Sequence, residues 1–452
     1  MVTTGLVAID ATVLAAAVTS VVDDLGGATQ FPWLFSIYLL TQAVSTPLFA
    51  KLADQRGRKP VILLGIAVFL VGSVLCGFAW NMPALIAFRA VQGLGAGAIQ
   101  PMAVTIVGDI YSVAERAKVQ AYISSVWAVS AVLGPALGGL FSQFSMWRAV
   151  FFINVPLCLL AAALLIRRFD EQVHRVRHTI DVRGALLLAG ATSAFILALL
   201  EGGQAWAWLS WQSVTAFVVA AVLVVMLVRV ERRAVEPVLP LALLGRRLLA
   251  TTTVLASAVG AVLLGLTTYV PSYLEHALDI PPLAAGLALA ALMIGWPVSS
   301  VFSGSLFYLR IGFTRTTIIG FSVVVAATVV LALFARTPTL WLVVVACFVV
   351  GMGLGLGAVP ALIAAQASVA WVERGVVTGA SMFARSLGSA VGVAVFGAVA
   401  NIHGTGTGPP ATDAVERTAA VLLAIAVTAA IGLALACAMP KTPAPGREQP
   451  PA

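Results

Sequence analysis

Charge is scarce in this chain. Only 10% of its 452 residues are Asp, Glu, Lys or Arg, whereas about 25% are charged in a typical soluble domain. Hydrophobic residues make up 61%. So few charges cannot cover the surface of a soluble protein of this length. The composition therefore excludes the soluble classes and predicts an all-α polytopic membrane protein.

Cysteine is scarce too, and its placement excludes two kinds of site. Cys76, Cys158, Cys347 and Cys437 each lie in an apolar run, and no two form a CxxC pair. Disulfides and metal sites are therefore not expected. The chain also lacks a soluble domain and a catalytic cluster, so we expect no enzyme, no metal and no cofactor. Because Met1 leads almost directly into an apolar run, without a basic region, we expect no cleavable signal peptide.

Long apolar runs are what the sequence has instead. A helix needs about 20 apolar residues to cross the hydrocarbon core of a bilayer. The sequence predicts fourteen such spans, at residues 2–22, 32–50, 60–80, 83–106, 119–141, 148–166, 184–200, 212–229, 249–274, 284–307, 316–335, 339–365, 375–400 and 418–438.

The basic residues support this count. With a cytoplasmic N-terminus, 21 of the 26 Lys and Arg residues fall in cytoplasmic segments, three fall outside, and Arg89 and Arg385 fall within spans. Lys and Arg concentrate on the cytoplasmic side of membrane proteins, so this distribution predicts that both termini are cytoplasmic. It also explains the net charge of +8 as a topology signal, which argues against a nucleic-acid partner.

The sequence repeats itself across its two halves. The matching stretches are GLGAGAIQP at 93–101 with GLGLGAVP at 353–360, Glu115-Arg116 with Glu373-Arg374, and AKLADQRGRK at 50–59 with SLFYLRIGFTR at 305–315. In these matches Gly57 falls on Gly312 and Gly134 falls on Gly392. Duplicated multi-span halves are typical of secondary transporters, whose binding site lies between the halves near the middle of the membrane.

The repeat predicts four segments. They are an N-terminal six-helix bundle over 1–167, two inserted helices with basic cytoplasmic linkers over 168–248, a C-terminal six-helix bundle over 249–440, and a short disordered cytoplasmic tail over 441–452.

Five motifs, in order along the chain, resemble those of the major facilitator superfamily. They are IDATV at 9–13, AKLADQRGRKP at 50–60, RAVQGLGAG at 89–97, SAVLGPALGG at 130–139 and WRAVFFINVP at 147–156. The last is similar to the start of the sixth helix in the fourteen-helix drug:proton antiporters. Ala50, Gln55 and Ser130 stand where the family usually has Gly, Arg and Gly.

The resemblance implies a major facilitator fold and proton-driven export of lipophilic compounds across the bacterial cytoplasmic membrane. It implies a cytoplasmic gate between the second and third helices, formed by Asp54, Gly57, Arg58 and Lys59. It also implies an antiporter motif in the fifth helix, formed by Gly134, Pro135, Gly138 and Gly139.

Asp10 is the only acid well inside a predicted span. A charge there costs several kcal/mol, so such acids are functional candidates. Burial disfavours the charged form of a carboxyl group, which suits a residue that loads and releases a proton. The alternative is a hydrogen-bonded packing residue beside Thr12. Arg89 cannot deprotonate, so it either biases a nearby carboxyl group or lines a water-filled path. Counted back from Gly353, its counterpart is the apolar Val349, and we therefore expect proton coupling in the first half alone.

Eight residues are candidates for a substrate cavity: Trp33, Tyr38, Gln92, Trp127, Tyr269, Tyr273, Trp296 and Arg385. For the aromatic residues the alternative is packing or contact with lipid, and Arg385 either faces the cavity or snorkels toward the cytoplasm. We predict a monomeric, proton-coupled secondary active exporter of lipophilic, cationic drugs or toxic compounds, working by alternating access. The alternative is an exporter of a specific metabolite, a self-made antibiotic or a lipid.

Overall fold

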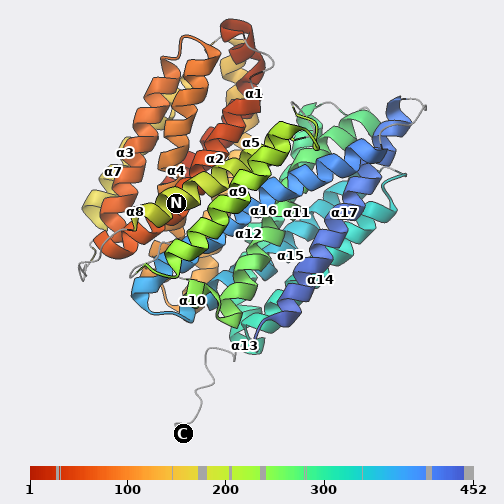
Figure 1. Ribbon diagram of the computed structural model, residues 1–452. Coiled ribbons are helices and arrows are strands. Elements are labelled where there is room, and N and C mark those ends of the chain that lie inside the picture. Colours follow the sequence, from red (N-terminus) through yellow and green to blue (C-terminus); the bar gives the residue numbers. More distant parts are fainter. Residues whose placement is uncertain are drawn as a thin grey trace. The chain divides into compact units, whose positions relative to one another are not determined.

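The chain is described by a computed structural model that covers residues 1–441 except 27–29, 31, 145, 170, 172–180, 203–205, 235–240, 279, 281, 338 and 404–409. The described residues form helices, with one isolated bridge between Gly202 and Trp206 (Figure 1). The predicted all-α class is confirmed. Of the predicted tail, only Lys441 lies within the described residues.

The α-helices follow one another along the chain as α1 (Val2–Leu25), α2 (Pro32–Arg56), α3 (Arg58–Gly77), α4 (Met82–Ile110), α5 (Val113–Gln143), α6 (Ala149–Phe152), α7 (Asn154–Arg168), α8 (Val182–Glu201), α9 (Trp211–Glu231), α10 (Leu241–Leu244), α11 (Arg247–Leu278), α12 (Pro282–Phe302), α13 (Leu309–Ile311), α14 (Phe313–Leu333), α15 (Leu340–Ala367), α16 (Arg374–His403) and α17 (Pro410–Ala438). A π-helix (Ser303–Tyr308) precedes α13, and a 3₁₀ turn (Trp371–Glu373) precedes α16.

Ten helices in the described part of the chain are long and apolar enough to cross a membrane. Three more apolar helical stretches are shorter, namely Val2–Leu14, Arg183–Leu199 and Ala288–Phe302. A multi-pass membrane protein is therefore supported, but the predicted count of fourteen spans is not confirmed.

The helices group into two compact units. The first contains residues 1–109, 129–241 and 370–383, and the second contains residues 110–128, 242–369 and 384–452. The inserted helices α8 and α9 pack against each other in the first unit, and α8 also packs against α2. Leu188 and Leu227 form the buried apolar contact there, with Leu48 against it. The predicted segment boundaries remain a prediction.

In the first unit, α4 is held close to both α2 and α3 by glycines that alternate in direction. A Cβ at Gly93 would lie within 2.5 Å of the backbone oxygen of Tyr38 on α2, whereas one at Gly95 would lie within 2.4 Å of the backbone nitrogen of Phe69 on α3. Gly97 faces α2 again. Real Cβ atoms do not approach the backbone so closely, so these positions need glycine. Small residues often permit such close packing between membrane helices.

The second unit repeats this arrangement and corrects the register of the repeat. Gly351 and Gly355 of α15 face α12, and Gly353 between them faces α14. Gly353 is therefore the counterpart of Gly95, not of Gly93 as the sequence match predicts. The offset becomes 258 residues, which is also the offset between Gly134 and Gly392.

The connection between α2 and α3 is a single residue. Gly57 has φ 96° and ψ 159°, and Gly312 before α14 has φ 89° and ψ 162°. This region of backbone conformation is essentially restricted to glycine. The predicted match between Gly57 and Gly312 is therefore confirmed by geometry. Most of the expected basic loop is helical, because α2 continues as far as Arg56.

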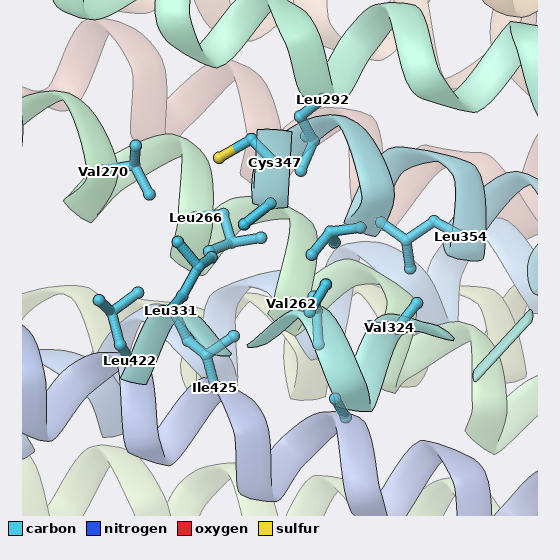
Figure 2. Close-up of a cluster of buried hydrophobic side chains, with 14 of the residues drawn as sticks. Val262, Leu266, Val270, Leu292, Val324, Leu331, Cys347, Leu354, Leu422 and Ile425 are labelled. Atoms are coloured by element: carbon cyan, nitrogen blue, oxygen red, sulfur yellow. The ribbon is translucent and has the colours of Figure 1, made fainter. Parts of the chain in front are cut away.

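An apolar core fills the second unit. Aliphatic side chains from α11, α12, α14, α15 and α17 meet there with Cys347 (Figure 2). The residues labelled in the figure are Val262, Leu266, Val270, Leu292, Val324, Leu331, Cys347, Leu354, Leu422 and Ile425.

Candidate functional site

The first unit contains an ion pair buried among its helices. Asp10 of α1 and Arg89 of α4 have side chains 0% and 1% exposed, and Arg89 Nη1 donates to Asp10 Oδ2 at 2.7 Å. Burying two charges costs several kcal/mol for each ion, which the pair recovers only when further hydrogen bonds complete its surroundings. The structure thus brings together the two residues predicted to couple protons.

Three polar side chains complete the surroundings of this pair. Gln92 Nε2 donates to Asp10 Oδ1 at 2.8 Å, and Asn154 Nδ2 donates to the same oxygen at 2.9 Å. The oxygen Ser73 Oγ accepts from both amides, at 3.2 Å from Gln92 and 2.9 Å from Asn154. Arg89 Nη1 also donates to Gln92 Oε1 at 2.7 Å. We call Asp10, Ser73, Arg89, Gln92 and Asn154 the buried polar cluster.

Local features of α3, α4 and the α6–α7 junction position the cluster. A Cβ at Gly72 would lie 2.5 Å from the backbone nitrogen of Gln92, so glycine lets α3 approach α4. Ser73 Oγ donates to the carbonyl of Phe151 at 2.8 Å. The helix is interrupted at Ile153 between α6 and α7, and Pro156 explains the interruption because it lacks the N–H that would bond to the carbonyl four residues earlier.

Helix α2 also contacts Arg89. Its Nε donates to the carbonyl of Leu34 at 3.2 Å, and its guanidinium lies 4.2 Å from the centre of the Tyr38 ring. A cation over an aromatic face is stabilised by the ring quadrupole. Tyr38 is buried, and its hydroxyl has no hydrogen-bond partner among the described residues.

The antiporter motif places α5 directly against α1. A Cβ at Gly134 would lie 2.2 Å from Thr12 Oγ1 and 2.4 Å from Thr12 Cβ. Glycine at this position thus lets α5 reach α1 two residues beyond Asp10. Pro135, Gly138 and Gly139 continue along the same helix.

Two of the four predicted gate residues, Asp54 and Arg58, contact the start of α16 and the turn before it. Asp54 accepts from the backbone N–H groups of Gly375 at 3.1 Å and Val376 at 2.8 Å, so its carboxylate binds the positive end of the helix dipole. Arg58 Nη2 pairs with Asp54 Oδ1 at 2.9 Å. A Cβ at Gly375 would lie 2.3 Å from Asp54 Oδ1, so this helix start requires glycine.

Arg58 links this contact to the end of α4. Its Nε donates to Asp109 Oδ2 at 3.0 Å, its Nη2 donates to the carbonyl of Trp371 at 2.9 Å, and its guanidinium lies 3.9 Å from the centre of the Trp371 ring. Arg374 Nη1 donates to the carbonyl of Gly108 at 3.0 Å. The start of α16 is therefore fixed to both α2 and α4.

A second carboxylate caps α3 at the same end. Glu171 accepts from the backbone N–H of Arg58 at 2.7 Å and of Lys59 at 2.8 Å. Lys59 Nζ also donates to the carbonyl of Ile166 at 3.1 Å. The end of α7 is thereby tied to the first turn of α3.

The opposite end of α1 carries a polar clamp. Asp24 Oδ2 accepts from Trp147 Nε1 at 3.0 Å and from Arg148 Nη1 at 2.7 Å. These two hydrogen bonds lower the pKa of Asp24 below its usual range, and the bond from Trp147 has the larger effect. The first two residues of the WRAVFFINVP motif thus attach the α5–α6 connection to α1.

The candidate cavity residues divide between the two units. Tyr38 and Gln92 belong to the surroundings of Asp10 and Arg89, and Trp33 is partly exposed in the same unit. In the second unit, Tyr273 is part of the apolar core and donates to the carbonyl of Ala335 at 2.5 Å, with Tyr269 and Trp296 against that core. Trp127 and Arg385, in the same unit, are partly exposed. A cavity shared by these residues remains a prediction.

The sequence analysis missed several members of the buried polar cluster and of the contacts around Asp54 and Arg58. Ser73 and Asn154 of the buried polar cluster were not predicted, although each is a polar residue within an apolar span. Asp109 was not predicted because it lies beyond the expected span at 83–106, and α4 continues as far as Ile110. Trp371 and Glu171 gave no recognisable signal.

The fold is that of a multi-pass helical membrane protein with an ion pair buried in its first unit, and comparison with known proteins identifies the family. The model of the Major Facilitator Superfamily matches residues 1–393. The chain belongs to this superfamily.

Several curated relatives are named as drug or efflux transporters. The chain is 32% identical over 394 residues to "Multidrug transporter protein MdtP" of Bacillus subtilis, covering 87% of this chain and 73% of that protein. It is 34% identical over 395 residues to "Multidrug resistance protein 3" of the same organism, with 87% and 76% covered. At family level these relatives support a drug exporter in a bacterial membrane.

Among solved structures, the chain resembles the human organic anion transporter MFSD10 (TETRAN) with a TM-score of 0.66. That match has 17% sequence identity and covers 95% of this chain and 97% of the other. At this identity the likeness concerns the fold alone.

Proposed function

We propose that this protein is a proton-coupled exporter of lipophilic, cationic compounds that works by alternating access through fourteen spans, with both termini in the cytoplasm. The observation that carries the proposal is the buried pair of Asp10 and Arg89 in the first unit. Relatives named as multidrug transporters support drugs as the substrates. No cofactor is required, because the proton gradient supplies the energy.

In this mechanism Asp10 carries the proton, because Arg89 is unable to release one. Protonation of Asp10 cancels the charge that faces Arg89 and weakens their attraction. The buried arginine then lacks its counter-charge, which favours a state in which water reaches it. Release of the proton restores the pair and the closed arrangement.

The proton gradient is sufficient for useful export. One charge that moves through about 100 mV supplies about 2.3 kcal/mol, and one pH unit adds about 1.4 kcal/mol. Together they correspond to a concentration ratio of several hundredfold for one proton per substrate.

The contacts of Asp54 and Arg58 with the start of α16 act, in this proposal, as the cytoplasmic gate. They join α2 and α4 to α16 through charge-assisted hydrogen bonds, which are about twice as strong as neutral ones. Opening toward the cytoplasm requires these bonds to break together.

Purified protein in proteoliposomes tests the proposal. We would impose a pH gradient, add ethidium and other lipophilic dyes, and compare the parent with Asp10→Asn. Dye uptake coupled to proton release in the parent, lost in the variant, is the expected result. Coupled flux that survives the substitution would move the proton to another residue, and dye transport that ignores the pH gradient would refute proton coupling.

Export of a compound made by the cell itself is the second candidate. It is supported by a relative named "Acurin A biosynthesis cluster MFS-type transporter", of Aspergillus aculeatus, at 28% identity. A narrow substrate range in the same dye panel, with a single metabolite or lipid transported, would favour this candidate.

A further inference from the structure

Asn154 is the one amide of the buried polar cluster that has an uncommitted hydrogen-bonding atom. It is fully buried, and its Nδ2 donates to both Asp10 Oδ1 and Ser73 Oγ. Its Oδ1 is buried and accepts no hydrogen bond from any described residue. A buried acceptor without a hydrogen bond requires an explanation, because buried polar atoms are normally hydrogen-bonded.

The other members of the cluster are fully engaged. Gln92 Oε1 accepts from Arg89 and lies 3.9 Å from the thiol of Cys76, while Gln92 Nε2 donates to Asp10 and Ser73. Arg89 has no acceptor atoms. If Asp10 takes up a proton, its new O–H therefore faces donors on Arg89 and Gln92, and within the cluster Asn154 Oδ1 is the acceptor that receives no hydrogen bond from a described residue.

We propose that Asn154 is a positioning residue that responds to the protonation state of Asp10. Its Nδ2 donates to the carboxylate when Asp10 is charged. When Asp10 is protonated, the amide turns over about its side-chain axis and its Oδ1 accepts the Asp10 O–H. The proton stays covalently bound to Asp10 throughout. This inference rests on the proposed function, because it assigns a role in the same proton site.

The position of Asn154 carries this change to the helix junction. Asn154 is the first residue of α7, directly after the interruption at Ile153. Ser73, which accepts from the Asn154 amide, also donates to the carbonyl of Phe151 on the other side of the interruption. A turn of the amide thus alters the hydrogen bonds that hold α3 to the α6–α7 junction.

The direction of the expected effect follows from bond strengths. Asn154→Leu keeps similar size but removes a charge-assisted bond to the carboxylate and a neutral bond to the acid. The charge-assisted bond is about twice as strong, so the substitution destabilises the charged form more. We expect the protonation midpoint of Asp10 to rise by about one pH unit, since one unit corresponds to a tenfold change in proton affinity.

The groups that face Asp10 determine the controls. Among the described residues they are Arg89 on α4, Tyr38 on α2, Cys76 on α3 and Cys158 on α7. Cys158 lies one turn beyond Asn154 on the same helix and is also buried, but it makes no hydrogen bond to Asp10. Cys158→Ala is therefore the matched control, with no expected shift.

Infrared difference spectroscopy of the reconstituted protein, stepped between pH 4 and 10, measures this midpoint without a substrate. The carboxyl band that disappears in Asp10→Asn belongs to Asp10. An upward shift in Asn154→Leu, absent in Cys158→Ala, is the expected result, and an unchanged midpoint would overturn the role of Asn154 alone. A parent without any titrating Asp10 band would overturn both this inference and Asp10 as the proton carrier.

Ser73→Ala is a second variant in case Asn154→Leu fails to fold. It removes the oxygen that anchors both amides and leaves Asp10, Arg89 and Asn154 in place. We expect a smaller upward shift of the same band, because the amides donate to the carboxylate from less fixed positions. A midpoint equal to that of the parent would count against the proposal.

Discussion

The contact between Asp54 and the start of α16 can be broken from either side. Asp54→Asn replaces two charge-assisted bonds to backbone N–H groups by at most one neutral bond. Bonds to charged groups contribute about 1.5–3 kcal/mol and neutral ones about 0.5–1.5 kcal/mol. With one neutral bond retained, the substitution should therefore reduce the free energy of unfolding by about 1.5–5.5 kcal/mol.

Gly375→Ala breaks the same contact without touching the charge. Its Cβ would lie 2.3 Å from Asp54 Oδ1, so the carboxylate must leave the helix start and loses the same two bonds. We expect a similar loss. Both substitutions remove the same interaction. The loss of unfolding free energy in the double variant should therefore be smaller than the sum of the two single losses, by about 1–3 kcal/mol.

Unfolding in mixed micelles of dodecyl maltoside and sodium dodecyl sulfate measures these free energies, and transport in proteoliposomes provides a second measurement. Asp23→Asn is the matched control, since Asp23 is an exposed acid near the end of α1, and it should have little effect. Strictly additive effects of Asp54→Asn and Gly375→Ala would show that the two residues do not act through one contact.

Two further predictions use the same unfolding measurement. Gly57→Ala and Gly312→Ala should each reduce the free energy of unfolding by about 1–3 kcal/mol, because alanine is strained at the positive φ of both residues. The control is Gly286→Ala, at an exposed helical position where a Cβ would meet no atom within 4 Å, and it should be neutral or slightly stabilising. An unchanged stability of Gly57→Ala would contradict the strain argument. Arg89→Met forces Asp10 to keep a proton when buried, so the stability of this variant should fall by up to about 1.4 kcal/mol per pH unit as the pH rises above the usual range of an aspartate. Asp10→Asn leaves a permanent buried cation and should show no such slope, so two parallel pH profiles would refute the assignment.

The sequence singled out Asp10 and Arg89 as candidates for proton coupling, but it predicted neither the ion pair between them nor the residues that surround it. Asp10 and Arg89 stand out because charge within an apolar span is costly. Ser73 and Asn154 carry no charge, and single hydroxyl or amide groups occur in many membrane helices for packing reasons. Their role depends on α3 and α7 meeting α1 at one place, which the sequence alone does not specify.

The predicted register of the repeat was wrong for a different physical reason. In α4 and α15 every second residue over several positions is glycine, so a shift of two residues leaves most of the match intact. What distinguishes the alternatives is the neighbouring helix that each glycine faces. Gly95 and Gly353 both face the third helix of their own unit, α3 and α14, and this contact fixes the offset at 258 residues.

The corrected register strengthens the case that the buried polar cluster serves a function rather than the fold. Arg89 now corresponds to Cys347, and Gln92 corresponds to Val350. Both counterparts are fully buried in the apolar core of the second unit. The equivalent helices pack there with an apolar pair of residues at these two positions. Since replacing buried ion pairs by apolar residues is often neutral or stabilising, packing alone does not require Asp10 and Arg89. The presence of an ion pair in the first unit and of apolar residues at the equivalent positions of the second is therefore best explained by a function that needs a charge in the first unit alone. Uptake and release of a proton is such a function.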